Sequence, residues 1–387
     1  MSVQQDGPIC ATEDAAPHAL AGLRVVSMAE QYPGPFCTML LSDLGAEVIQ
    51  VERPGTGDPA RFLSAFYESV NRGKRSVALD IRQPESKARL LELLAEADVF
   101  LEGFRPGKLA KQGLAYEDVR ALNPSIVYCS ISGYGQTGPY RDRPGHDLSY
   151  QGVGGALAER LDGQVHGLPP SLLLGDTASA LYAAIGILGA LLGRERTGQG
   201  TYIDISMTDT VMAAMTVFVG MLGQETAAPP QAEPAYDLFE CADGRFLTLS
   251  VAHEDAYWAR LCADLGIMDV AGLARRERVA QRTVLHARIA GAIAAQPFAH
   301  WEAVFGASGQ MWGPANRIAD LPDDPQIRAR GLMQRLTRAD GVAQWVLRQP
   351  IRFSAYENAP LTPAPGLGEH DGKGFVSRDA VSGQAEP

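Results

Sequence analysis

The sequence lacks the cysteine spacings that mark a disulfide framework or a structural zinc site. Its five cysteines are scattered over 387 residues, and no two of them form a CxxC pair. This pattern argues against a thiolate metal centre and indicates a reducing compartment. We therefore predict no metal site and expect the protein in the cytoplasm.

Long apolar runs are also missing. No segment reads as a membrane span, and a membrane partner is not expected. Residues 1–20 contain acidic residues and prolines but no continuous apolar stretch of the kind that a signal peptide needs. We interpret them as a disordered leader.

The common phosphate-binding motifs are missing from the places where a nucleotide site would need them. The turn after the first predicted strand lacks GxGxxG, and the sequence contains no GxxxxGK(S/T). Pro33-Gly34-Pro35 lies where a dinucleotide-binding turn would be expected, but its two prolines remove backbone N–H donors that such a turn needs. Neither a nicotinamide cofactor nor an ATP site is predicted.

What is present is a globular composition with an acidic balance, 46% hydrophobic and 20% charged residues with a net charge of −11. This charge disfavours a nucleic-acid partner. The chain exceeds the usual size of one domain, and its composition changes to a proline-rich stretch at residues 224–234. We expect a large domain over 21–223, a linker over 224–234, a small domain over 235–330 and a final segment over 331–387.

Apolar strands alternate with helical patterns through the first half of the chain, which predicts an α/β fold with a parallel sheet. The predicted strands are residues 23–28, 46–52, 76–80, 98–102, 126–131 and 202–207, and the predicted helices are 36–45, 84–97, 148–157, 181–192 and 210–222. The last two helices are apolar all round, so we expect them to be buried. For the small domain we predict a strand at 246–251 and helices between 255 and 305.

Basic side chains gather where predicted strands end. They are Arg53, Arg72, Lys74, Arg75, Arg105, Lys108 and Lys111. Ligands of open α/β sheets bind at the carboxyl ends of strands, so a convergence of these cations would suit a phosphorylated small molecule. Exposed lysines and arginines are also common on any solvated surface.

Asp176 follows the apolar run 172–174 and precedes a predicted helix. An aspartate there is either an N-cap or a carboxylate for chemistry, and both roles place it at the positive end of the helix dipole, which lowers a carboxylate's pKa. His146 precedes Asp147 at another helix start, where the pair is either a cap or a candidate base. The glycine-rich loop 132–140 suits the wall of a site or an ordinary surface loop.

Several motifs, in order along the chain, resemble those of the family III CoA-transferases and the related α-methylacyl-CoA racemases. They lie at residues 30–35, 43–54, 71–76, 102–107, 132–135, 175–176, 194–198, 350–354 and 366–370. The resemblance implies an interlocked homodimer with a large Rossmann-like domain, which the C-terminal segment completes, and a smaller α+β domain. It also implies CoA or acyl-CoA and a carboxylic acid as substrates, with no permanently bound cofactor.

The resemblance also implies roles for individual residues. The residues that match the CoA-binding and substrate-binding positions of the family are Arg53, Lys74, Arg75, Phe104, Arg105, Lys111, Tyr134, Gly135 and Glu254. Asp176 matches the catalytic aspartate, which in the transferases attacks the thioester and carries CoA as an aspartyl thioester.

Racemases of the superfamily instead use a histidine and the aspartate as an acid/base pair, and His146 stands at the histidine position. After the aspartate, however, Thr177-Ala178-Ser179-Ala180 is nearer to the transferase pattern. We therefore predict a CoA-transferase, with a 2-methylacyl-CoA racemase or epimerase, or an isomerase, as the alternative.

Overall fold

The computed structural model describes residues 17–157, 172–223, 233–338 and 340–376. Most of the predicted leader and most of the predicted linker lie outside these residues. The chain divides into two compact units, of which the first comprises 1–158, 167–216 and 330–387 and the second comprises 159–166 and 217–329. The predicted domain boundaries remain predictions.

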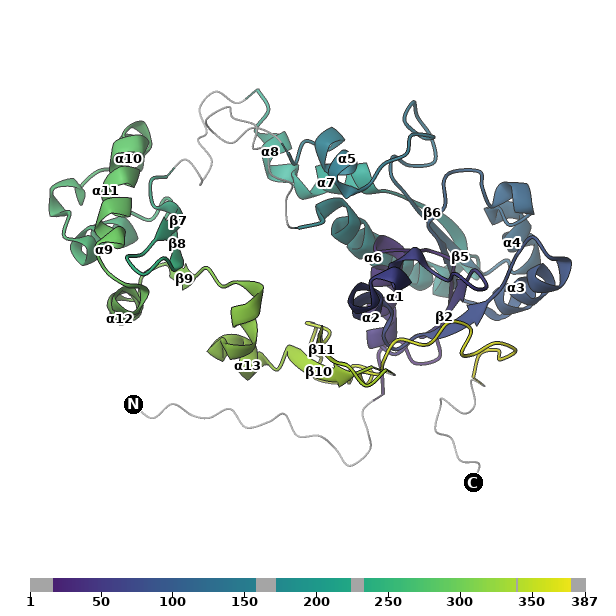
Figure 1. The fold of residues 1–387 in the computed structure, drawn as a ribbon. Helices are drawn as coiled ribbons and strands as arrows, with labels where there is room; N and C mark the ends of the chain where they lie inside the picture. Colours follow the sequence, from purple (N-terminus) through teal and green to yellow (C-terminus); the bar gives the residue numbers. More distant parts are fainter. Residues whose placement is uncertain (1–16, 158–171, 224–232, 339, 377–387) are drawn as a thin grey trace. The chain divides into compact units, whose positions relative to one another are not determined.

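The first unit is built on a parallel sheet with helices around it (Figure 1). The sheet has six strands in the order β3-β2-β1-β4-β5-β6. Its strands are β1 (Arg24–Ser27), β2 (Glu47–Glu52), β3 (Arg75–Ala78), β4 (Val99–Glu102), β5 (Val127–Ser132) and β6 (Thr201–Ser206). This is the doubly wound order, in which strands β2 and β3 extend the sheet to one side of β1 and strands β4 to β6 extend it to the other. The predicted Rossmann-like α/β fold is confirmed.

Helices cover both faces of this sheet, which is why its central strands read as continuous apolar runs. The helices of the unit are α1 (Pro33–Asp43), α2 (Ser64–Asn71), α3 (Pro84–Glu96), α4 (Tyr116–Leu122), α5 (Asp147–Val153), α6 (Leu174–Thr197) and α7 (Met207–Ala214), with short 3-10 turns η1 (Pro59–Phe62) and η2 (Ala110–Gln112). One core cluster joins α1 and α6 to one face of the sheet, and a second joins α3 and α4 to the other.

Helix α6 is longer and less buried than predicted. It begins at Leu174 and not at the predicted residue 181, so Asp176 lies within the helix, and Ile185 on its outer side is 64% exposed. By length and composition alone α6 could cross a membrane, but Ala180, Ala183 and Ile187 pack into the core. Only one stripe of the helix faces the sheet, so its apolar outer side remains open.

The predicted helix over 210–222 is two helices, α7 and α8 (Thr216–Gly220), and α8 has no buried residue. Phe218 of α8 is exposed, whereas Thr210 and Val211 of α7 are buried. The prediction that the whole segment is buried is therefore wrong. The segment is apolar throughout, so its composition could not show which part would pack against the rest of the protein.

The C-terminal segment contains the hairpin β10 (Met333–Thr337) and β11 (Ala343–Leu347) and then runs beside β3. The His370 N–H donates to the Ser76 carbonyl at 2.9 Å, and the Asp371 carboxylate accepts from the Ala78 N–H at 2.7 Å. The segment thus covers the exposed edge of the parallel sheet.

The second unit has a three-stranded antiparallel sheet, β7-β8-β9, packed with helices. Its elements are β7 (Tyr236–Glu240), β8 (Phe246–Ser250), α9 (Asp255–Leu265), η4 (Met268–Val270), α10 (Arg275–Ala280), α11 (Arg282–Ala294), α12 (Phe298–Ser308), β9 (Trp312–Pro314), η5 (Ile318–Asp323) and most of α13 (Pro325–Arg330). Trp258 and Trp301 lie in its core. Arg278, fully buried, pairs with Glu233 and Asp255.

Candidate active site

The N-terminus of α6 is capped by a residue from another helix. Asp147, in the first turn of α5, accepts hydrogen bonds through Oδ1 from the Gly175 N–H at 2.7 Å and the Asp176 N–H at 3.2 Å. A Cβ at position 175 would lie 3.1 Å from the same oxygen, so glycine lets the carboxylate approach. Gln151 holds Asp147 from the other side through Oδ2 and also donates to the Leu172 carbonyl. The orphan N–H groups of α6 are therefore satisfied from outside the helix.

Asp176 is thus not the N-cap but the third residue of α6, with its carboxylate left for another role. Among the described residues, no hydrogen bond or ion pair to this carboxylate is found. Burial, and then the nearby charge of Asp147, raise the pKa of Asp176 to about 7. The expected lowering by the helix N-terminus is wrong, because desolvation and a like charge outweigh the dipole.

Tyr150 joins several predicted site residues to this helix start. Its ring meets that of Tyr134 edge to face at 5.2 Å, and its hydroxyl donates to the Gly145 carbonyl at 2.6 Å. Burial, followed by Tyr134 and the charge of Asp176, raises the pKa of Tyr150 to about 12, while the charge of Arg105 opposes the rise. Tyr134 thus contacts a tyrosine that was not singled out from the sequence, and the charges of Arg105 and Asp176 act on it.

The glycine-rich loop after β5 is held against β6. Gly135 has a φ of +84°, a conformation that favours glycine, and the next residue, Gln136, donates its N–H to Asp204 at 3.0 Å. Gly133 packs so tightly on the Tyr150 ring that a Cβ would lie 2.4 Å from a ring carbon. The loop is an ordered wall next to Tyr134.

His146 occupies the N-cap position of α5 with an exposed side chain. Its side chain makes no capping hydrogen bond, although its carbonyl accepts from the Ser149 N–H at 2.8 Å. Asp147 therefore caps α6 and not its own helix, and the expectation of a local His146–Asp147 capping pair is wrong. The contact between this part of α5 and the start of α6 is made by the adjacent residue, Asp147.

The predicted cationic group is only partly exposed. Arg53 follows β2, is 61% exposed and pairs through its guanidinium with Glu30. Arg75 pairs with Glu47 and donates to the Gly374 carbonyl, so it fastens the C-terminal segment to the sheet.

Two more of these cations are buried. Lys74 donates to the Pro35 carbonyl and to Asn71, both at 2.8 Å, and burial lowers its pKa to about 7. Arg72 is buried against Asp43. Asn71 lies three residues from Lys74, but Pro35 and Asp43 lie 39 and 29 residues from the cations they meet, so the sequence could not show these two partners.

The loop after β4 presents the remaining cations. Arg105, Lys108 and Lys111 are exposed, and the Lys108 ammonium lies 4.4 Å from the centre of the Phe104 ring. The Phe104 N–H donates to buried Glu102, which fixes the start of the loop. An aromatic face and three cations are thus gathered at the carboxyl end of β4.

Glu254 belongs to the second unit, whereas the residues gathered around Tyr150 belong to the first. It occupies the N-cap position of α9 and accepts a hydrogen bond from the Ala252 N–H at 3.1 Å. Its substrate-binding role remains a prediction.

Tyr150 and Gln151 were not predicted as site residues, and Asp147 was named only as the neighbour of His146. All three lie on one short buried face of α5, and their spacing of three and four residues along the predicted helix was the available signal. The arrangement offers a half-buried carboxylate at a helix start, unpaired among the described residues and near Tyr150. Such a group can act as a nucleophile or as a base.

Residues 20–371 match the protein family described as CoA-transferase family III. A succinate–glutarate CoA-transferase of Agrobacterium fabrum is 34% identical over 95% of this chain and 98% of its own. A succinyl-CoA:glutarate CoA-transferase of Mus musculus is also 34% identical, over 91% and 84%. A CAIB/BAIF family crystal structure from Brucella suis matches 92% of this chain and 97% of its own, with a TM-score of 0.80 and 33% identity.

Proposed function

The chain belongs to the family III CoA-transferases and is an enzyme that acts on CoA thioesters, and from this premise we propose that Asp176 carries CoA as a covalent intermediate. The observation that carries the proposal is the first turn of α6. There Asp147 satisfies the backbone, and the half-buried Asp176 carboxylate has no partner among the described residues.

The reaction begins when an Asp176 oxygen attacks the carbonyl carbon of the donor thioester. The C–S bond breaks, CoA leaves as the thiolate, and the acyl group remains on Asp176 as a mixed anhydride. The thiolate then attacks the Asp176 carbonyl carbon, which forms the aspartyl-CoA thioester and releases the donor carboxylate.

The acceptor carboxylate repeats these steps in reverse. It attacks the aspartyl thioester to form a second anhydride, and the returning thiolate attacks the acceptor carbonyl, which frees Asp176. No water or redox step enters, so we propose that no permanent cofactor is needed. The raised pKa of Asp176 fits this chemistry, because a more basic, desolvated carboxylate is a stronger nucleophile.

CoA, in this proposal, lies along the carboxyl ends of β1, β2 and β4. We assign its phosphates to Arg53, Arg105 and Lys111, which are exposed, and its adenine or pantetheine to the face of Phe104. Lys74 and Arg75, predicted as direct contacts, are engaged by protein groups and are not assigned to phosphate here.

The relatives suggest the acyl groups. Both named relatives pair succinate or succinyl-CoA with glutarate, so we propose that this enzyme exchanges CoA between short dicarboxylic acids. The racemase alternative is not carried forward, since both relatives are transferases and His146 makes no side-chain hydrogen bond at its helix start.

Hydroxylamine trapping tests the covalent route. After incubation with succinyl-CoA and hydroxylamine, peptide mass spectrometry should find a hydroxamate on Asp176, and activity should be lost. Asp209→Asn, which changes a first-turn aspartate of α7, is the matched control and should label normally. Absence of any Asp176 adduct with every donor that supports turnover would contradict the proposal.

A panel of donors and acceptors tests the substrate class. Succinyl-CoA and glutaryl-CoA should exchange with succinate and glutarate, while acetate should be a poor acceptor. Equal rates with acetate and glutarate would refute the dicarboxylate preference but would not contradict the proposed role of Asp176.

We further propose a homodimer in the cytoplasm. The apolar outer side of α6, with Leu181, Ile185 and Leu192 exposed, supports a second copy as its cover. The scattered cysteines support a reducing compartment. Light scattering coupled to size-exclusion chromatography should give twice the monomer mass, and Ile185→Glu should reduce it.

A further inference from the structure

Gln31 has an unusual backbone. Its φ is +67°, and it is the one non-glycine residue with a positive φ in the part of the chain that the structure describes. L-residues enter this left-handed region at a conformational cost, and glutamine has no special tolerance for it. Such strain persists only where the surroundings hold it, and it tends to occur at functional sites.

Its position in the fold is the second observation. Gln31 lies between β1 and α1, at the carboxyl end of β1, where the order of the sheet reverses. In open α/β sheets this switch point is where ligands bind. On one side Glu30 pairs with Arg53, and on the other the Tyr32 ring stacks on Phe36 and Phe66.

Asp58 holds the strained residue directly. The Gln31 N–H donates to both oxygens of the Asp58 carboxylate, each at 3.0 Å. Asp58 is 0% exposed and also accepts from the Ala60 N–H at 2.8 Å. A buried carboxylate that depends on these N–H groups fixes their positions in return.

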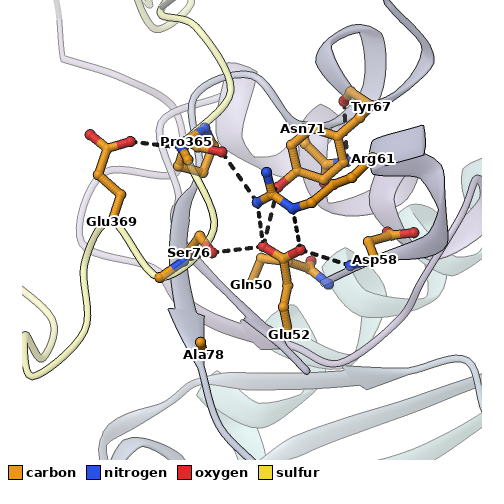
Figure 2. Close-up of polar contacts among 12 residues, drawn as sticks. Gln50, Glu52, Asp58, Arg61, Tyr67, Asn71, Ser76, Ala78, Pro365 and Glu369 are labelled. Carbon is orange, nitrogen blue, oxygen red and sulfur yellow. Dashed lines mark hydrogen bonds and ion pairs between the residues drawn. The ribbon is translucent and has the colours of Figure 1, made fainter. Parts of the chain in front are cut away.

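Asp58 is itself held by Glu52 (Figure 2). The Asp58 N–H donates to Glu52 Oε2 at 2.9 Å, and the same carboxylate accepts from Arg61 at 2.7 and 2.6 Å and from the Ser76 hydroxyl at 2.7 Å. Burial alone raises the pKa of Glu52, but these hydrogen bonds outweigh it and keep that pKa below its usual value. Glu52 therefore remains ionised, and both of its carboxylate oxygens accept hydrogen bonds while it holds Asp58 in place.

The C-terminal segment completes the frame, as Figure 2 shows. Arg61 donates to the Pro365 carbonyl at 3.2 Å, and the Gly368 N–H donates to the Ser76 hydroxyl oxygen at 3.0 Å. Residues more than 280 positions apart thus support the same short loop. An ordinary surface turn is not usually held by such a network of buried hydrogen bonds.

We propose that Asp58 is a positioning residue that holds Gln31 in the left-handed conformation and thereby shapes the turn Glu30–Tyr32 for binding of the CoA substrate. The inference rests on the proposed function, since it takes the switch point to be the CoA site. Asp58 does not touch the reacting atoms. It acts through the backbone of Gln31.

This role can be separated from a merely structural one. Asp58 also caps η1 through Ala60, so any Asp58 variant loses stability as well. A glycine at position 31 adopts a φ of +67° without a clamp, whereas alanine does not. Only the positioning role therefore predicts that glycine at position 31 restores the CoA affinity that is lost when Asp58 is replaced.

The experiment measures the Kd of CoA by isothermal titration calorimetry in the full-length protein, because this readout needs no turnover. Asp58→Ala should weaken binding about 5- to 30-fold, the factor by which a non-glycine residue disfavours the left-handed region. Adding Gln31→Gly should return the Kd to within about threefold of wild type. Adding Gln31→Ala, the matched control, should not.

The melting temperature is followed in parallel and should stay low in both double variants, because neither restores the cap of η1. If Asp58→Ala does not fold, Asp58→Asn, which keeps one acceptor oxygen, is combined with the same two changes at position 31. Equal Kd values for the glycine and alanine double variants, or an unchanged Kd on loss of Asp58, would overturn the proposal.

Failure of the proposed function gives a different result. An enzyme that binds CoA but transfers it to no acid would refute the transferase scheme while the Kd comparison still tests Asp58. A wild-type protein that binds no CoA would overturn both.

Discussion

Asp176→Asn should inactivate the enzyme and at the same time stabilise it. Asparagine has nearly the same shape as aspartate and removes a carboxylate that is half-buried, unpaired among the described residues and close to the charge of Asp147. The hydrogen bonds from Asp147 to the start of α6 use backbone N–H groups, so they survive the change. The stability effect should therefore report the charge at Asp176 alone.

The magnitude follows from the pKa of Asp176, which is raised from 3.8 to about 7 by burial and by Asp147. Because the folded state holds this proton more tightly than the unfolded state, stability falls as pH rises between these two values. The difference corresponds to a destabilisation of the folded state by about 4 kcal/mol when Asp176 is ionised. The dipole of α6 offsets at most about 2 kcal/mol of this destabilisation. Asp176→Asn should thus stabilise the protein by about 2 to 4 kcal/mol at about pH 8, and by less than half as much at about pH 5.

Calorimetric melting of both proteins at the two pH values measures this effect as a rise of several degrees in Tm. Asp209→Asn, at the first turn of α7, is the control and should show little pH-dependent gain. A stabilisation that is the same at both pH values would refute the reasoning, because packing and not charge would then be its cause. So would a destabilisation at the higher pH.

Three further predictions concern the reaction and the two units. The kcat/KM profile should rise with pH through about 7 as Asp176 ionises, and Asp147→Asn should move this limb to lower pH by removing a like charge, as pH–rate measurements will show. Arg53→Ala should raise the KM for acyl-CoA about threefold to tenfold with little change in kcat, whereas Arg82→Ala at another exposed ion pair should not, in steady-state assays. Arg278→Ala removes a fully buried partner of Glu233, a buried carboxylate that then keeps only Arg275, and thermal unfolding should show a loss of about 3 kcal/mol in the second unit; an unchanged melting curve contradicts that role.

The sheet was accessible from sequence because buried parallel strands are continuous apolar runs. All six predicted strands of the large domain lie within two residues of the observed ones. Helix boundaries were harder, since α6 begins at Leu174, several residues before its all-round apolar stretch. Elements with mixed patterns, such as α2 and β10, were not predicted, because packing against other segments decides their structure.

The candidate site divides in a similar way. Arg105, Tyr134 and Asp176 were predicted from motifs, and the structure gathers them around Tyr150. Arg72 and Lys74 were predicted among the cations of a phosphate-binding patch but are buried, because Asp43 and Asn71 reach them. A single sequence carries no sign of which cation will meet a partner.

The sequence by itself determined the α/β class, the order of the strands along the chain, and the presence of an aspartate at the start of an apolar helix. Only the tertiary structure decided what that aspartate is free to do. Its expected capping role belongs to Asp147, which reaches the helix from 28 residues away and leaves Asp176 half-buried with a raised pKa. Periodicity and propensity are local, whereas capping, burial and charge proximity depend on which distant segments meet.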